Sequence, residues 1–244
     1  MSDAPLQIVW FKRDLRVDDH APLRAAAEAG PVVGLYILEP EVIGVPESHP
    51  RHWEFVLASL VEVRRELRER GSDLLVRRGE ATAVVRRLVA GLRDRGVPVG
   101  AVRSHEETGL DVTFRRDRRM KRALRELGVE WVETPQFGVV RGLRDRDGWA
   151  RRWAERMDTP PVGAPERFAP LPGPLRDVGV AGEIPALAEL MPADRALAEL
   201  APADRAMASP THPGQPAGEA EAHRTLASFL GRGDAPPRGV NYRA

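Results

Sequence analysis

Residues 7–23 read QIVWFKRDLRVDDHAPL and pass from an apolar run through a polar loop into a helix start. The run from Gln7 to Phe11 is typical of a buried β-strand. We expect Asp18 and Asp19 to cap the next helix, because Pro22 stands in its first turn and an Ala-rich segment continues to residue 29. A strand, a loop and a helix in this order form the repeating unit of an α/β fold.

The same alternation continues as far as residue 157. Further strands are expected at 32–38, 74–76, 99–102 and 129–132, and further helices at 51–70, 82–95, 112–127 and 149–157. The apolar stripe expected on the first long helix comprises Phe55, Val56, Leu60, Val63 and Leu67. The pattern predicts an α/β fold with a doubly wound, five-stranded parallel sheet of the Rossmann-like type. Ligands of such sheets bind beyond the carboxyl ends of the strands, so we expect the loops after Phe11, Leu38 and Arg103 to line one crevice.

Composition changes after Met157. Residues 158–217 are rich in proline and glycine and contain a near-repeat at 192–197 and 202–207, which indicates a linker. From Gly218 a short terminal helix is expected, with Ala222, Leu226, Phe229 and Leu230 on one face. The predicted organisation is therefore an α/β domain over 1–157, a linker over 158–217 and a third segment over 218–244.

Several classes of function lack support in the sequence. There is no cysteine, so disulfides and thiolate chemistry are excluded within the chain, and the formal net charge of +1 gives no general attraction to nucleic acid. No apolar run is long enough to span a membrane and no secretory leader is recognisable, so a cytoplasmic protein is expected. His105 has no second histidine at ligand spacing, so no metal site is predicted, and His20 is interpreted as a hydrogen-bonding residue at a helix start.

The loop after the first strand allows two interpretations. Arg13, Asp14 and Arg16 could form an ion-pair network that fixes the loop. Alternatively, backbone amides and Arg13 could hold an anionic or planar ligand at the helix N-terminus. The five tryptophans at 10, 53, 131, 149 and 153 are interpreted as core or helix-packing residues.

The segment from Trp10 to Leu23, with Trp-Phe-Lys-Arg-Asp-Leu-Arg at its start, resembles the opening of DNA photolyases and cryptochromes. The resemblance extends to Tyr-Ile-Leu-Glu-Pro at 36–40, to Gly79, to the arginine-rich stretch 115–119 and to Gln-Phe-Gly-Val-Val at 136–140. Residues 218–242 resemble the start of that family's helical flavin domain. The likeness thus covers almost the whole chain.

The resemblance implies a two-domain flavoprotein. The N-terminal α/β domain of this family often holds an antenna chromophore, such as a folate, a deazaflavin or a flavin nucleotide. The C-terminal helical domain holds FAD and binds damaged DNA, for light-driven repair of pyrimidine dimers, or serves blue-light sensing. Because the sequence stops soon after Tyr242, we expect a truncated flavin domain, no catalytic residue and no FAD binding by this chain alone.

Family positions carried over one at a time give a candidate antenna site. Its residues are Phe11, Arg13, Ile37, Leu38, Glu39, Arg51, Glu106, Glu107, Thr108, Gly109, Arg115 and Arg119, and Tyr242 matches a flavin-contacting tyrosine. Apolar walls with a few arginines and carboxylates suit a planar ring with a polar rim. The acidic pair at 106–107 and the arginines at 115 and 119 could instead form a solvated helix start. Two rival functions stay open: a small-molecule or nucleotide-binding α/β protein without light chemistry, and a non-functional remnant.

Overall fold

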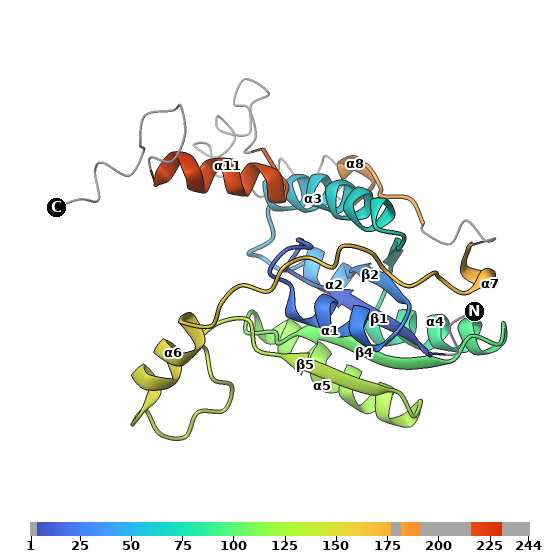
Figure 1. The fold of residues 1–244 in the computed structure, drawn as a ribbon, viewed down its shortest axis with the longest axis horizontal. Helices are drawn as coiled ribbons and strands as arrows, with labels where there is room; N and C mark the ends of the chain where they lie inside the picture. Colours follow the sequence, from blue (N-terminus) through green and yellow to red (C-terminus); the bar gives the residue numbers. More distant parts are fainter. Residues whose placement is uncertain (1–3, 177–181, 191–215, 231–244) are drawn as a thin grey trace. The chain divides into compact units, whose positions relative to one another are not determined.

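The computed structural model describes residues 4–176, 182–190 and 216–230 (Figure 1). The chain divides into two compact units. The first comprises residues 1–48 and 64–183, and the second comprises residues 49–63 and 184–244. Helix α3 (Pro50–Glu69) contributes to both, and each unit is described by itself.

The first unit is built on a five-stranded, all-parallel sheet. Its strands are β1 (Leu6–Phe11), β2 (Val32–Leu38), β3 (Leu74–Arg78), β4 (Val99–His105) and β5 (Glu130–Thr134). They lie in the order β3-β2-β1-β4-β5, which confirms the predicted doubly wound sheet. Strand order reverses between β1 and β4, so the topological switch point lies where these two strands end.

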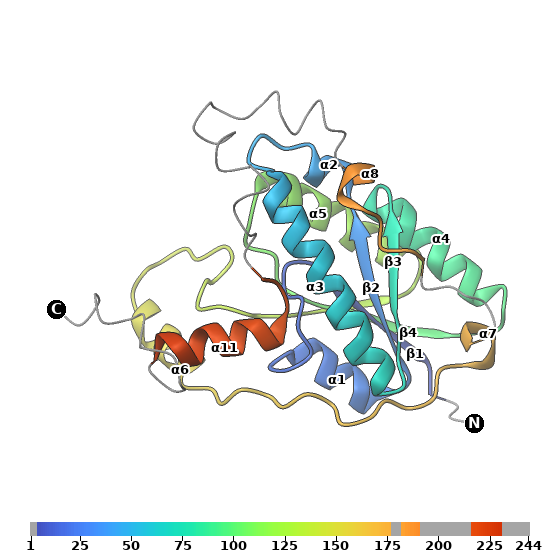
Figure 2. The same cartoon turned by 90° about the horizontal axis from the view of Figure 1, so that it is seen from above.

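Helices cover both faces of the sheet. Side chains of α4 (Ala81–Arg93) and α5 (Asp111–Glu126) pack with Leu6, Ile8 and Trp10 in one hydrophobic core. Helix α1 (Ala21–Ala29) lies on the other side of β1 and β4, as Figures 1 and 2 show. The other helices among the described residues of this unit are α2 (Pro40–Ile43), α6 (Trp149–Met157), α7 (Gly173–Arg176) and the second part of α3.

The N-cap prediction for α1 was wrong. The N-cap residue is His20, whose Nδ1 accepts a hydrogen bond from the backbone N–H of Leu23 at 3.1 Å. Asp18 and Asp19 instead accept hydrogen bonds from a segment more than 140 residues further along the chain. Local sequence could not show this, because either arrangement satisfies an aspartate next to a helix start.

Residues 159–168, here called the strap, are fastened to the first unit. The N–H of Asp19 donates to the carbonyl of Val162 at 2.8 Å, and the N–H of Val162 donates to Asp19 Oδ1 at 3.2 Å. The N–H of Ala164 donates to Asp18 Oδ1 at 2.9 Å, and that of Phe168 donates to the carbonyl of Arg70 at 2.8 Å. The compact unit thus extends past residue 157, although the division into domains stays a prediction.

The stripe expected on α3 was partly wrong. Phe55 is exposed, whereas Trp53, Leu57, Leu60, Val63 and Leu67 are buried. Steps of three and four residues connect these five positions, and Phe55 falls between them. Among the tryptophans, Trp10 is buried as expected, whereas Trp149 and Trp153 of α6 are 40% and 45% exposed.

The described helices of the second unit, besides the first part of α3, are α8 (Leu187–Leu190) and α11 (Glu219–Phe229). The predicted apolar face of the terminal helix exists, and its Leu226, Phe229 and Leu230 are exposed. Among the described residues, no helix is both long and apolar enough to cross a membrane. The near-repeat at 192–207 and Tyr242 lie outside the described residues.

Candidate functional site

Two buried polar clusters lie where β1, β2 and β4 end. The charge cluster comprises Lys12, Glu39, Glu107, Arg116 and Asp117. The histidine cluster comprises Asp14, His20 and His105. Their side chains come from the loops after β1, β2 and β4, from the end of β4, from the N-cap of α1 and from the second turn of α5. The parallel sheet thus assembles both clusters from distant parts of the sequence.

Arg116 is the centre of the charge cluster. Its Nη1 lies 2.6 Å from Glu39 Oε1, and its Nη2 lies 2.9 Å from Asp117 Oδ1 and 3.5 Å from Glu107 Oε2. Its guanidinium also stands over the ring of Trp10, 4.8 Å from the ring centroid. The side chain is only 4% exposed, so this guanidinium depends on protein partners in place of water.

Lys12 is the second buried cation. Its Nζ lies 3.6 Å from Asp117 Oδ2, 5.1 Å from the ring centroid of Trp10 and 5.7 Å from that of Trp131. Within the described part of the chain, the Nζ has no partner at hydrogen-bond distance. Burial lowers the pKa of Lys12, and the charge of Asp117 opposes this shift. Two indole rings and one carboxylate therefore replace the water that a lysine ordinarily retains.

Acidic groups outnumber basic ones in the buried part of this cluster. Burial raises the pKa of Glu39, and the opposing effect of Arg116 does not cancel that rise. Glu107 Oε1 accepts hydrogen bonds from the backbone N–H groups of Thr108 at 3.1 Å and Gly109 at 2.8 Å. Arg13, with 73% of its side chain exposed, lies 3.8 Å from the same oxygen. The exposed Arg13 thus adds the positive charge that the buried groups lack.

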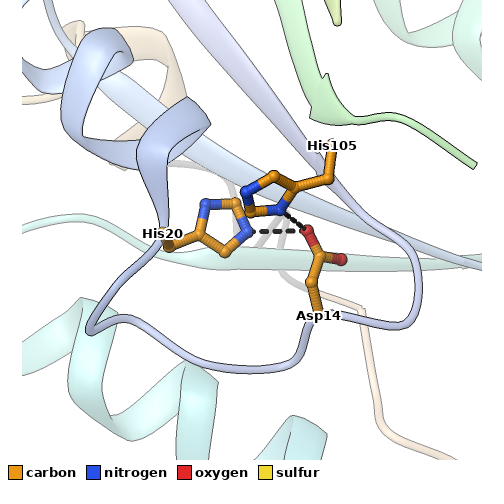
Figure 3. Close-up of side chains that lie close together, drawn as sticks. All are labelled: Asp14, His20 and His105. Atoms are coloured by element: carbon orange, nitrogen blue, oxygen red, sulfur yellow. Dashed lines mark hydrogen bonds and ion pairs between the residues drawn. The ribbon is translucent and has the colours of Figure 1, made fainter. Parts of the chain in front are cut away.

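The histidine cluster lies on the opposite face of the sheet. Phe11, whose side chain alternates with that of Trp10, contacts His20 at a ring-centroid distance of 4.8 Å. Asp14 Oδ2 lies 2.9 Å from His20 Nε2 and 2.5 Å from His105 Nδ1 (Figure 3). Asp14 Oδ1 accepts a hydrogen bond from the N–H of Lys12 at 2.8 Å. One carboxylate therefore joins the loop after β1, the start of α1 and the end of β4.

The electrostatics of Asp14 follow from these contacts. Burial by itself would raise the pKa of Asp14, but His20 and His105 hold it well below its ordinary value. The ion-pair network of Arg13, Asp14 and Arg16, one of the two interpretations of this loop, is not formed among these three residues. Arg16 pairs with Asp19 at 3.6 Å and Arg13 with Glu107, whereas Asp14 turns inward to the histidines.

The histidine cluster has the composition of a metal site. The candidate ligand atoms of the three residues lie within 4.8 Å of one another. However, Nδ1 of His20 accepts the N–H of Leu23, so the ring proton belongs on Nε2, which faces Asp14. A metal ligand needs the lone pair of that nitrogen, and histidine ligands ordinarily donate from their second nitrogen. The helix cap therefore disfavours metal binding here.

The structure unites only part of the predicted antenna site. Glu39 and Glu107 meet at Arg116, with the N–H groups of Thr108 and Gly109 beside Glu107. Phe11, Ile37 and Leu38 are core residues that are at most 4% exposed.

The other predicted positions lie at the surface of the chain or outside this cluster. Glu106 pairs with Arg141 at 3.0 Å, Arg119 pairs with Glu41 at 2.7 Å, and exposed Arg115 pairs with Asp111. Arg51 is exposed and belongs to the second unit, and Tyr242 lies outside the described residues. The part of these residues in ligand binding stays a prediction.

Arg116 and Asp117 were missed by the sequence reasoning, although a signal for them existed. The buried positions of α5 are Thr113, Arg116, Asp117, Met120, Ala123 and Leu124. Their spacing is that of an amphipathic helix whose core-facing stripe includes two charged residues. Charged side chains on such a stripe are seldom buried without partners, so their position could have identified them as members of a polar site.

The sequence of this chain matches a known protein family. The family model for DNA photolyase matches residues 7–141. A cryptochrome DASH of Gloeobacter violaceus is 34% identical over 201 residues, which cover 75% of this chain and 38% of the relative. A deoxyribodipyrimidine photo-lyase of Halobacterium salinarum is 30% identical over 182 residues, covering 66% of this chain and 36% of the relative.

Solved structures share the fold. A class III photolyase of Agrobacterium tumefaciens aligns over 95% of this chain and 45% of its own, with a TM-score of 0.64 and 21% identity. An archaeal photolyase of Sulfolobus tokodaii, solved with two FAD molecules, aligns over 78% of this chain and 43% of its own, with a TM-score of 0.56 and 21% identity. The chain spans less than half the length of each of these four proteins.

Proposed function

Because the chain belongs to the DNA photolyase family, we propose that it is the N-terminal α/β domain of a light-dependent flavoprotein and holds an antenna chromophore. The complete protein would add a helical domain that binds FAD, and would repair pyrimidine dimers or sense blue light. Residues 158–217 would act as the linker, and residues 218–244 would begin the helical domain. This chain alone would carry no catalytic activity.

The observation that carries the antenna role is the charge cluster at the switch point. Ligands of doubly wound sheets bind beyond the carboxyl ends of the strands, where Glu39 and Glu107 converge on Arg116. Pterin and flavin rings present hydrogen-bond donors and acceptors along one edge, which carboxylates, arginines and backbone N–H groups can match. The exposed guanidinium of Arg13, beside Glu107, would contact the rim of such a ring.

The family offers three classes of candidate chromophore: folates, deazaflavins and flavin nucleotides. The Sulfolobus tokodaii photolyase contains two FAD molecules, and its structure was reported as implying a novel light-harvesting cofactor. That precedent supports testing a flavin nucleotide beside the other two classes.

Reconstitution tests this proposal. The purified chain is mixed with a folate, a deazaflavin or FMN, and Tm is followed against ligand concentration. A ligand at 100 times its Kd should stabilise the folded state by about 2.7 kcal/mol. The complex should also show the visible or near-ultraviolet absorbance of the chromophore after gel filtration.

Glu107→Gln should weaken binding, because Glu107 is 8% exposed and positions the N–H groups of Thr108 and Gly109. Glu126→Gln, on the exposed end of α5, is the matched control and should bind normally. No rise in Tm with any of the three classes would refute the antenna role. A rise with a nucleotide that absorbs no visible light would favour the rival small-molecule-binding function.

FAD binding and DNA binding are assigned to the proposed helical domain. The chain alone should therefore retain no stoichiometric FAD after purification. It should also not change the fluorescence anisotropy of an ultraviolet-irradiated oligonucleotide. Its formal net charge of +1 is consistent with weak attraction to a polyanion.

A further inference from the structure

The loop between β1 and α1, residues 12–20, is held by two sets of contacts, here called the inner and the outer fastening. On its inner side, Asp14 and His20 join His105 at the end of β4. On its outer side, Asp18 and Asp19 hold the strap through three hydrogen bonds that involve the N–H groups of Asp19, Val162 and Ala164. The histidine cluster and the strap thus share one short loop.

The two fastenings meet at Asp19. Its φ of 47° is the only positive φ of a non-glycine residue among those described. Aspartate tolerates this left-handed conformation better than most residues, yet it remains strained by about 1–3 kcal/mol. The neighbours of Asp19 hold it there: His20 is fixed by the cap and by Asp14, and the N–H of Asp19 is bound to Val162. Loss of the inner fastening would let the backbone relax and would weaken the outer one.

The contacts of the inner fastening depend on the protonation state of the imidazole rings. With both rings neutral, His105 Nδ1 shares a hydrogen bond with Asp14 Oδ2, and His20 Nε2 lies 2.9 Å from the same oxygen without hydrogen-bond geometry. A second proton on His105 would place a charged imidazolium in a site where its side chain is 3% exposed.

Charged and titratable groups approach His105 from the β1–α1 loop and from its own strand. From the loop they are Asp14, Arg16 and His20, the last being the N-cap of α1. Arg103 lies on the same strand as His105 and Glu106 directly follows it, and the partner of His105 on β5 is the uncharged Thr134. Asp14 is therefore the acidic group among these that contacts His105, and His20 shares it.

We propose that Asp14, His20 and His105 form a proton-responsive latch, which holds the strap on the β1–α1 loop near neutral pH and releases it in acid. The latch requires no chromophore and no flavin domain, so it stands or falls independently of the proposed antenna role.

The direction follows from linkage. Burial lowers the pKa of His105 below 6.5, and the hydrogen bond with Asp14 opposes that shift. The closed latch therefore favours the neutral form of His105, whereas in the open state the solvated ring takes up a proton at its ordinary pKa of about 6.5. Opening is favoured as pH falls below that value, and a single proton changes the opening equilibrium by at most about tenfold between pH 7.5 and 5.5.

Hydrogen exchange of single amides tests the latch on the intact chain. Rates are corrected for the intrinsic pH dependence of exchange, and protection factors are compared at pH 7.5 and 5.5. The N–H groups of Asp19, Val162 and Ala164 should lose protection at pH 5.5, by at most about tenfold. The N–H of Phe168 is an internal control, because it binds Arg70 in the same strap but away from the loop, and should change little.

Two substitutions of one residue separate protonation from simple loss of contact. His105→Asn retains an N–H donor near the position of Nδ1 but cannot titrate, so the strap amides should stay protected at both pH values. His105→Ala removes the donor, so their protection should be low at both. His52→Asn, at an exposed histidine of the second unit, should behave as the unchanged chain.

Three results would overturn the latch. The first is strap protection that is equal at the two pH values in the unchanged chain. The second is a pH dependence that survives in His105→Asn. The third is a rise in Tm with Zn²⁺ that His20→Asn abolishes, which would replace the latch by a metal centre.

Discussion

Replacing Arg116 by methionine is the sharpest test of how the charge cluster is held together. The change removes a guanidinium that contacts Glu39, Glu107 and Asp117 and leaves three buried carboxylates with Lys12 as the remaining buried cation. Removing one partner of a buried ion pair costs about 3–5 kcal/mol, because the remaining charge stays buried without compensation. We therefore expect Arg116→Met to lower the free energy of unfolding by about that amount.

Urea denaturation at pH 7.5, followed by tryptophan fluorescence, measures this loss. With an m-value of about 2 kcal/mol per molar urea, a loss of 3–5 kcal/mol lowers the midpoint by about 1.5–2.5 M. Arg115→Met is the matched control from the next position of α5, because that side chain is 67% exposed and pairs only at the surface with Asp111. It should cost less than about 1 kcal/mol.

Arg116→Lys provides a second measurement in case the Arg116→Met variant does not fold. It keeps the charge but lacks the planar fork that contacts several carboxylates at once, so its midpoint should fall between those of the unchanged chain and Arg116→Met. Equal midpoints for Arg115→Met and Arg116→Met would refute the claim that Arg116 neutralises the buried carboxylates.

Three further predictions concern single residues. Burial raises the pKa of Glu39, so the folded state favours the protonated carboxyl more than the unfolded state does. This contribution to stability is present below the unfolded pKa of 4.5 and is lost as pH rises through the folded pKa. In Glu39→Gln, the urea midpoint should therefore depend less on pH just above 4.5 than in the unchanged chain. Gly34→Ala should lower the free energy of unfolding by about 1–3 kcal/mol, because the new Cβ would lie 2.8 Å from Leu74 Cδ1 inside the core. Gly91→Ala should instead raise the free energy of unfolding by about 0.5–1 kcal/mol and thereby raise Tm, because its nearest contact is the flexible end of Arg95 and alanine is favoured over glycine within a helix. Asp19→Asn should leave Tm nearly unchanged, because asparagine tolerates a positive φ, and Asp19→Val should lower it by several degrees; equal Tm values for the two variants would argue against strain at this position.

The sheet could be predicted because its signal is local. Apolar runs and glycine-terminated helices predicted the alternation of strands and helices, and all five strands are present, whereas the short helices α2, α7 and α8 were not predicted. Their lengths were underestimated where polar side chains continue a strand. Backbone pairing between β1 and β4 extends to Val9 and Arg103, since ladder hydrogen bonds do not depend on side-chain polarity.

The site could be predicted only in part because its contacts are not local. On α5 the sequence reasoning chose Arg115 and Arg119, although Arg116, between them, is the buried arginine. Its partner Glu39 is 77 positions away, and only the pairing of the strands brings the two together. His20 and His105 were likewise weighed one at a time, because nothing in sequence spacing indicates that they share Asp14.

The strap has a consequence for the order of events during protein synthesis. Val162 binds Asp19 across 143 positions of the chain. At a synthesis rate of about 5–20 residues per second, residue 162 leaves the peptidyl-transferase centre about 7–29 s after residue 19. The sheet, whose last strand ends at Thr134, can pair in that interval, whereas the left-handed turn at Asp19 must wait for its partner. A nascent chain should therefore acquire its strands first and the final conformation of the β1–α1 loop last.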